Sequence, residues 1–222
     1  MKIGILIALD EEAKSLISNF KLIQKIKTTC YEVFEYEFNN HQLFFLSTGV
    51  GEINASSSAQ FLITKFGVEL IINYGVCGLL NSEIKSTLML VNKVCHYDID
   101  TSLIDNIEKG RYFYFDSVYI PVYFYKINDL SKKLNLENVI CASGDTFVAE
   151  ESFKNELIKN YSADICEMEL AGIALVCEKN KIPLISLKAV SDNASSSEYN
   201  DEKVLALSEI LFNKFVDILR LI

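Results

Sequence analysis

Short apolar runs alternate along this chain with segments of helical periodicity, and this alternation restricts the fold more than any other feature. The runs that predict strands are Lys2–Leu9, Tyr31–Phe38, Gln42–Ser47, Glu69–Tyr74, Leu88–Cys95, Asn138–Ala142 and Pro183–Val190. The segments that predict helices are Asp10–Phe20, Glu52–Phe66, Glu150–Asn160, Met168–Asn180 and Glu202–Ile222. The hairpin signal Asn39-Asn40 makes the sheet mixed. We therefore expect an α/β fold, a three-layer αβα sandwich around a central mixed, twisted sheet.

Length and charge narrow the choices further. The 222 residues contain no internal repeat or low-complexity linker, which favours a single domain over residues 1–222. Half of the residues are hydrophobic, which is enough for a full core. The net charge is −9, and only Arg111 and Arg220 among the 21 basic residues are arginines. An acidic chain with so few arginines is not expected to bind nucleic acid.

Neither a membrane nor an oxidising compartment is indicated. Charges interrupt every stretch of the roughly 20 residues that a membrane span needs. The first apolar run meets Asp10-Glu11-Glu12 without a small-residue cleavage site. The six cysteines form no CxxC pair, and no Cys/His cluster has zinc spacing. We expect a cytoplasmic protein without disulfides or a structural metal.

Polar groups gather where the expected strands end. Asp10-Glu11-Glu12 follows the first strand, Gly75–Gly78 forms an expected turn after the fourth, Ser143–Asp145 follows the sixth, and Ser191-Asp192 follows the last. Ligands of α/β sheets usually bind at the carboxyl ends of strands. Dinucleotide, Walker, Gly-x-Ser-x-Gly and HExxH motifs are absent, so acid–base chemistry would fall to carboxylates.

Taken in order, these motifs resemble a known superfamily. They are Lys2-Ile3-Gly4-Ile5 with Glu12, Ser47-Thr48-Gly49-Val50-Gly51, Asn73-Tyr74-Gly75-Val76-Cys77-Gly78, Ser143-Gly144-Asp145-Thr146-Phe147-Val148, Glu167-Met168-Glu169 and Ala189-Val190-Ser191-Asp192. The order resembles the purine nucleoside phosphorylases and nucleosidases and, within them, the 5′-methylthioadenosine/S-adenosylhomocysteine nucleosidases. The resemblance is weak between Ser102 and Glu137.

The resemblance implies hydrolysis of an N-glycosidic bond, which releases adenine and a 5-thio-substituted ribose. It implies that Glu12 activates water and that Asp192 protonates the adenine ring. The implied substrate-binding residues are Gly78, Phe147, Val148, Met168, Glu169, Lys188 and Ser191. In this assignment Met168 and Glu169 hold the ribose, Phe147 stacks on the base and the Val148 backbone reads its edge.

Elementary chemistry supports two carboxyl groups with different roles. Cleavage makes the sugar oxocarbenium-like and leaves the purine as an anion unless an acid protonates it, so an acid above the purine and a base below the sugar lower the barrier. Asp192 would need burial to hold a proton, whereas Glu12 should stay ionised near water. By analogy with inverting glycosidases, the two carboxyl groups should lie on the order of 6.5–9.5 Å apart. No metal or organic cofactor is required.

Three features depart from the pattern. Lys188 stands where the nucleosidases usually have an arginine near the water, and lysine lacks the planar fork. Val76 replaces a small hydroxyl residue in the glycine segment. The aromatic stretch Arg111–Phe115 lies in the weakly matched region, where it would form core, a dimer contact or a wall of the 5′-substituent pocket.

Other functions stay open at this point. Phosphorolysis is the nearest rival, although neither arginine lies in a matching motif. A futalosine-type nucleosidase is a second, and 5′-deoxyadenosine is a third substrate to consider. A non-catalytic nucleoside-binding protein would be expected to lose Glu12, Glu169 or Asp192, and all three are present. The expected partners are a nucleoside, water and a second copy of the chain in a homodimer.

Overall fold

The computed structural model describes residues 1–194 and 201–222, apart from the side chain of residue 201. The strands are β1 Lys2–Ile7, β2 Leu22–Lys27, β3 Glu32–Phe38, β4 His41–Ser47, β5 Leu70–Leu79, β6 Leu88–His96, β7 Glu137–Ser143, β8 Ile165–Glu167 and β9 Leu184–Asp192. The helices are α1 Asp10–Asn19, α2 Glu52–Phe66, α3 Ser102–Asp105, α4 Ile127–Leu134, α5 Glu151–Tyr161, α6 Leu170–Asn180 and α7 Asp201–Leu221. The polar loop expected at Ser195-Ser196-Ser197 lies outside the described residues.

The strands form one mixed sheet in the order β2-β3-β4-β1-β5-β8-β7-β6-β9. β1 runs parallel to β4 and β5, and β3 pairs with β4 in the expected antiparallel hairpin. Asn39 and Asn40 both have positive φ in its turn, as hairpin turns of this length require. β9 pairs with β6 and also with β5, so β5, β8, β7, β6 and β9 close into a ring.

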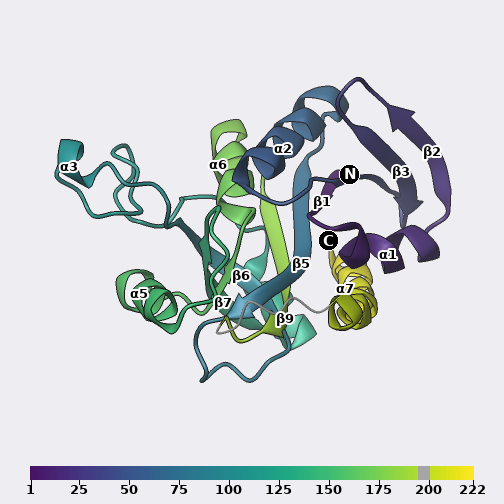
Figure 1. The fold of residues 1–222 in the computed structure, drawn as a ribbon. Coiled ribbons are helices and arrows are strands. Elements are labelled where there is room, and N and C mark those ends of the chain that lie inside the picture. Colours follow the sequence, from purple (N-terminus) through teal and green to yellow (C-terminus); the bar gives the residue numbers. More distant parts are fainter. Residues whose placement is uncertain (195–200) are drawn as a thin grey trace.

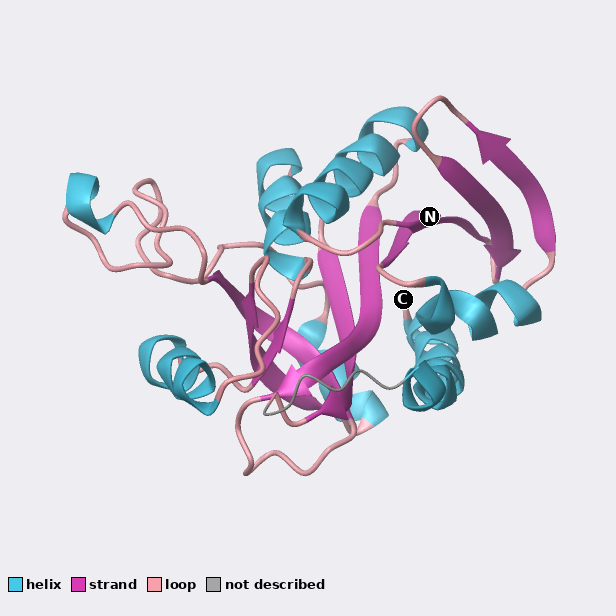
Figure 2. Ribbon diagram, in the orientation of Figure 1, coloured by secondary structure: helices cyan, strands magenta, loops and turns pink. Residues whose placement is uncertain are grey.

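Helices cover both faces of the sheet (Figures 1 and 2). α2 and α6 pack on one face, in a cluster that includes Leu6 of β1, and α1 and α7 pack on the other, in a cluster that includes Ile3 and Ile5. Successive side chains of a strand point to opposite faces, so an entirely apolar strand serves both clusters. This arrangement confirms the expected α/β fold with a central mixed sheet.

The structure differs from the expected elements at one turn and in four elements that were not expected. The turn expected at Gly75–Gly78 is wrong, because these residues continue β5 and pair with Lys188–Asp192 of β9. Cross-strand hydrogen bonds override the local turn signal of the glycines. The elements β2, β8, α3 and α4 were not expected, since each is short or, like β2, mostly exposed and without an apolar face.

Two further features position the site. The buried Ser208 of α7 donates from its Oγ to the Glu12 carbonyl oxygen at 2.9 Å and accepts from the Ser15 backbone N–H at 3.1 Å. The last helix therefore fixes the backbone of the helix that carries Glu12. No helix in the described ranges has both the length and the hydropathy that membrane crossing requires.

Candidate active site

The ends of several strands meet around a cavity of about 330 Å³. Its walls are Ala8, Leu9, Glu12, Val50, Val76, Cys77, Gly78, Thr146, Phe147, Val148, Cys166, Glu167, Met168, Glu169, Ser191 and Asp192. These residues lie in or directly after β1, β4, β5, β7, β8 and β9 and on α1. All the site residues expected from the sequence line this one cavity, except Lys188.

Glu12 is held by one main-chain donor from β5 and one from the N-cap of its own helix α1. The Val76 N–H donates to Oε1 at 2.6 Å, and the Leu9 N–H donates to Oε2 at 3.0 Å. A Cβ atom at residue 75 would lie 2.6 Å from Glu12 Oε1, so only glycine fits there. Burial raises the pKa of Glu12, although Val76, Leu9 and Lys188 each act to lower it. Val76 has no side-chain hydroxyl that could donate a hydrogen bond to Glu12. Its backbone N–H donates one instead.

Asp192 is the last residue of β9. It lies near the C-terminal end of the chain, whereas Glu12 lies near the N-terminal end. Its Oδ2 accepts from Ser191 Oγ at 2.7 Å, and its Oδ1 accepts from the Ala194 N–H at 2.8 Å. The expected burial is wrong for both groups, because Asp192 is half-buried whereas Glu12 is only 3% exposed. Main-chain donors compensate the buried Glu12 carboxylate, which is why it tolerates removal from water.

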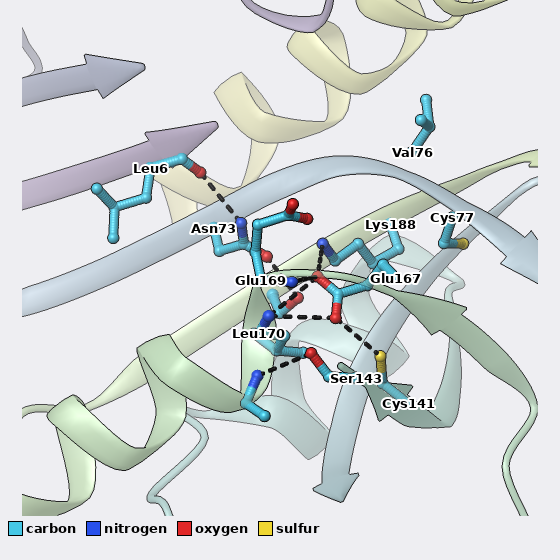
Figure 3. A network of polar contacts seen from close by, with 12 residues as sticks. Leu6, Asn73, Val76, Cys77, Cys141, Ser143, Glu167, Glu169, Leu170 and Lys188 are labelled. Atoms are coloured by element: carbon cyan, nitrogen blue, oxygen red, sulfur yellow. Dashed lines mark hydrogen bonds and ion pairs between the residues drawn. The ribbon is translucent and has the colours of Figure 1, made fainter. Parts of the chain in front are cut away.

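Lys188 lies behind the cavity wall rather than on it. Its side chain is buried, and Nζ binds Glu167 Oε2 at 3.0 Å (Figure 3). Burial alone would lower the pKa of Lys188 and raise that of Glu167, but their mutual attraction reverses both directions. The Leu170 and Glu169 N–H groups also donate to Glu167. The pair thereby joins β8, β9 and the start of α6.

Two more glutamates, Glu169 and Glu52, lie near the Lys188–Glu167 pair. Glu169 accepts at Oε1 from the Gly51 N–H at 3.0 Å, and burial followed by the charge of Glu167 raises its pKa to about 7. The buried Glu52 accepts from Ser143 Oγ at 2.5 Å, and burial followed by Glu167 raises its pKa to about 8. Sequence reasoning missed Glu52, because an acid at the start of a helix has an ordinary explanation there.

The rest of the cavity wall is largely apolar. Phe147 is 47% exposed and Val148 is buried, directly after the end of β7. A Cβ at residue 78 would lie 3.0 Å from Cys166 Sγ and 3.3 Å from Asp192 Oδ1, so glycine keeps this wall open. Cys166 also lines the cavity, and the sequence analysis did not single it out. A largely apolar wall with a few carboxylates is typical of a small-molecule binding site.

The aromatic stretch 111–115 does not line the cavity. Tyr112 Oη lies 2.7 Å from His96 Nδ1, and Phe115 packs against the core. Phe113 and Tyr114 are 71% and 50% exposed. Within one described chain, the stretch is therefore partly core and partly surface.

Known proteins are similar to this chain in sequence and in fold. A family model described as the phosphorylase superfamily matches residues 2–219. The aminodeoxyfutalosine nucleosidase of Campylobacter jejuni is 33% identical over 96% of each chain. The 5′-methylthioadenosine/S-adenosylhomocysteine nucleosidase of Buchnera aphidicola is 32% identical over 99% of this chain and 97% of its own. The chain belongs to the phosphorylase superfamily.

Solved structures agree with that assignment. The crystal structure of the Campylobacter jejuni 5′-methylthioadenosine/S-adenosylhomocysteine nucleosidase matches this chain with a TM-score of 0.90 and 31% identity. The match covers 100% of both chains. The Helicobacter pylori nucleosidase of the same name, complexed with a substituted pyrrolidin-3-ol, has a TM-score of 0.91 at 24% identity, which shows the shared fold.

The raised pKa values predict how stability depends on pH. Unfolded glutamates lose their protons near pH 4.5, whereas Glu169 and Glu52 hold theirs to about 7 and 8. Between these limits the folded state binds more protons, so the free energy of unfolding should fall as pH rises from about 5 to 8. Glu52→Gln should make the slope shallower, by up to about 1.4 kcal/mol per pH unit.

Urea denaturation at several pH values measures this slope. Ser58→Ala is the matched control, because Ser58 is buried on the same helix α2 and does not titrate. A Glu52→Gln slope equal to that of the wild type would contradict the account.

Proposed function

We propose that this protein hydrolyses the N-glycosidic bond of 5′-methylthioadenosine and S-adenosylhomocysteine, releasing adenine and a 5-thio-substituted ribose. The observation that carries the proposal is the shared cavity, where Glu12 and Asp192 face the same space from opposite ends of the chain. The names of the Buchnera and Campylobacter relatives support the same reaction. A third substrate of the same chemistry is 5′-deoxyadenosine.

Glu12 is the proposed base. As the glycosidic electrons move to the purine, positive charge develops on the ribose, and a carboxylate beneath it stabilises that charge and takes a proton from water. The raised pKa of Glu12 brings it toward the range of an effective base at neutral pH. The main-chain donors of Leu9 and Val76 fix the direction in which its oxygens point.

Asp192 is the proposed acid. A proton delivered to the ring lets the purine leave as a neutral base rather than an anion. Ser191 and the Ala194 N–H hold both carboxyl oxygens, so the group is oriented before a nucleoside arrives. The predicted separation of the two carboxyl groups remains a prediction.

The remaining wall residues suit the two halves of a nucleoside. Met168 and Glu169 lie where they could hold the ribose, with the carboxylate accepting from its hydroxyls. Phe147 offers a ring for stacking, the Val148 backbone offers hydrogen bonds to the purine edge, and Gly78 permits close approach. Lys188 supports them from behind: it lowers the pKa of Glu12 and Glu169 without touching the cavity.

A second candidate is hydrolysis of aminodeoxyfutalosine, which the name of the Campylobacter relative favours. It would use the same carboxyl groups and the same adenine pocket with a larger 5′ group. Phosphorolysis is less well supported, because neither arginine of the chain lines the cavity. Arginine is the side chain best suited to grip phosphate in a bidentate way.

Replacement of either proposed catalytic group should abolish most turnover. Asp192→Asn cannot supply the leaving-group proton, and Glu12→Gln cannot accept one from water, so each should lower kcat by about 10²–10⁴-fold. Adenine release measured by absorbance tests this. Glu209→Gln, an exposed change on α7, is the control. Near-normal adenine release by Asp192→Asn would overturn its assignment.

The sugar product distinguishes the candidate reactions. We expect the wild-type protein, incubated with methylthioadenosine, S-adenosylhomocysteine, 5′-deoxyadenosine or aminodeoxyfutalosine, to give a free sugar with and without phosphate. Mass spectrometry of the product identifies it. Formation of a sugar 1-phosphate would mean phosphorolysis, and binding of a nucleoside without turnover would mean a non-catalytic binding protein.

The finer setting of this activity is also proposed. The enzyme would act in the cytoplasm, in methionine salvage, as a single-domain protein that needs no metal or organic cofactor and binds no nucleic acid. It would be a homodimer with its active sites near the interface. Exposed apolar side chains at the cavity rim (Val50 and Phe147) and nearby on α2 (Ile53, 79% exposed) support such an interface.

Light scattering at micromolar concentration should give twice the chain mass of 25.1 kDa. A charged substitution at the exposed position, Ile53→Glu, should shift the mass toward that of one chain, because a buried charge is costly. A monodisperse monomer of the wild-type protein would refute the dimer.

A further inference from the structure

The mechanism proposed above leaves the buried carboxyl group of Glu52 unused. Glu52 is the first residue of α2 and is 6% exposed. It does not line the cavity, yet its neighbours do, since Val50 stands two residues before it and Glu169 lies across from it. A buried carboxyl group is costly unless hydrogen bonds satisfy it, so its partners indicate what it holds.

The Glu52 carboxyl group bridges two elements that face α2. Its Oε1 accepts from Ser143 Oγ at the end of β7 at 2.5 Å, and its Oε2 accepts from the Gly172 N–H in the first turn of α6. Ser143 Oγ in turn accepts from the Ala171 N–H at 2.9 Å (Figure 3). Two of the free N–H groups at the start of α6 are thereby tied, directly or through Ser143, to one side chain of α2.

The backbone of the same segment holds the proposed ribose ligand. The Gly51 N–H donates to Glu169 Oε1 at 3.0 Å, and Glu169 is the N-cap residue directly before α6. The contacts therefore run in both directions: the start of α2 holds the Glu169 side chain, and the Glu52 side chain holds the turn that follows Glu169. A Cβ on residue 172 would lie 2.6 Å from the Glu52 carbonyl oxygen, so the two helices approach closely only because residue 172 is glycine.

We propose that Glu52 is a positioning residue, which fixes the first turn of α6 against the start of α2 so that the Glu169 carboxylate faces the cavity in the orientation that binds the ribose hydroxyls. The inference rests on the proposed function, because it needs Glu169 to bind ribose. Because Glu52 does not line the cavity, we assign it a role through Glu169 and no contact with substrate.

The charges around Glu52 agree with a specific role. The groups that face it are Ser143 of β7, Glu167 of β8 and Glu169 just before α6. The charge of Glu52 also acts to raise the pKa of Tyr112, which lies in the loop 106–126. Burial and Glu167 raise its pKa to about 8, so it is largely neutral at pH 7. A neutral group of the same shape should therefore preserve the clamp, whereas a truncated group should not.

The test compares Glu52→Ala and Glu52→Gln in the full chain. We expect Glu52→Ala to raise KM for methylthioadenosine about tenfold or more. Binding of adenine alone, which has no ribose, should stay within about twofold of the wild type by calorimetry. Glu52→Gln should return KM to within about threefold, because its amide can bond both Ser143 Oγ and the Gly172 N–H. Ser58→Ala, a buried change elsewhere on α2, should change neither value.

The results distinguish a positioning role of Glu52 from a general structural role and from no role. Equal losses of adenine and nucleoside binding in Glu52→Ala would mean a general structural role, and unchanged KM would mean none; either would overturn the proposal. If Glu52→Ala does not fold, Ser143→Ala serves in its place, and it should raise KM severalfold with adenine binding kept. A wild-type protein that cleaves no nucleoside would instead sink the proposed function, which is a separate result.

Discussion

A single buried ion pair holds the site together. Lys188 and Glu167 are both almost removed from water, and each would be costly there without the other. Because Lys188 lies in the middle of β9 and Glu167 ends β8, the pair fixes β8 against β9. The N–H groups that donate to Glu167 extend this hold to the start of α6. Removing one partner of such a pair typically costs about 3–5 kcal/mol, since the other charge is left unpaired.

The surrounding carboxyl groups depend on that positive charge. Glu12, Glu167 and Glu169 all feel Lys188, which lowers the pKa of each. Main-chain donors supply the remaining compensation, from Leu9 and Val76 for Glu12 and from Gly51 for Glu169. These N–H groups belong to the residues just before α1 and α2 and to Val76, which lies in β5 beyond its pairing with β1.

Part of this could be read from the sequence, for physical reasons. Apolar runs bury both faces of a strand, so β1 and the carboxylate of Glu12 after it were predictable, as were helix α2 over its whole length and the clustering of Glu12 with Asp192. The predictions that were wrong concern features that depend on residues far away in the sequence. Gly75–Gly78 continue a strand because β9 pairs with them, and the burial of Glu12 and Asp192 is set by segments far away in sequence. Glu52 and the position of Lys188 behind the wall give no local signal at all.

The ion pair can be tested by a double-mutant cycle in urea denaturation with Lys188→Met, Glu167→Gln and the combined variant. The account predicts that Lys188→Met alone lowers the free energy of unfolding by about 3–5 kcal/mol, and that adding Glu167→Gln recovers enough to give a coupling energy of about 2 kcal/mol or more. If the two single losses instead add to within about 0.5 kcal/mol, the pair does not hold the site together.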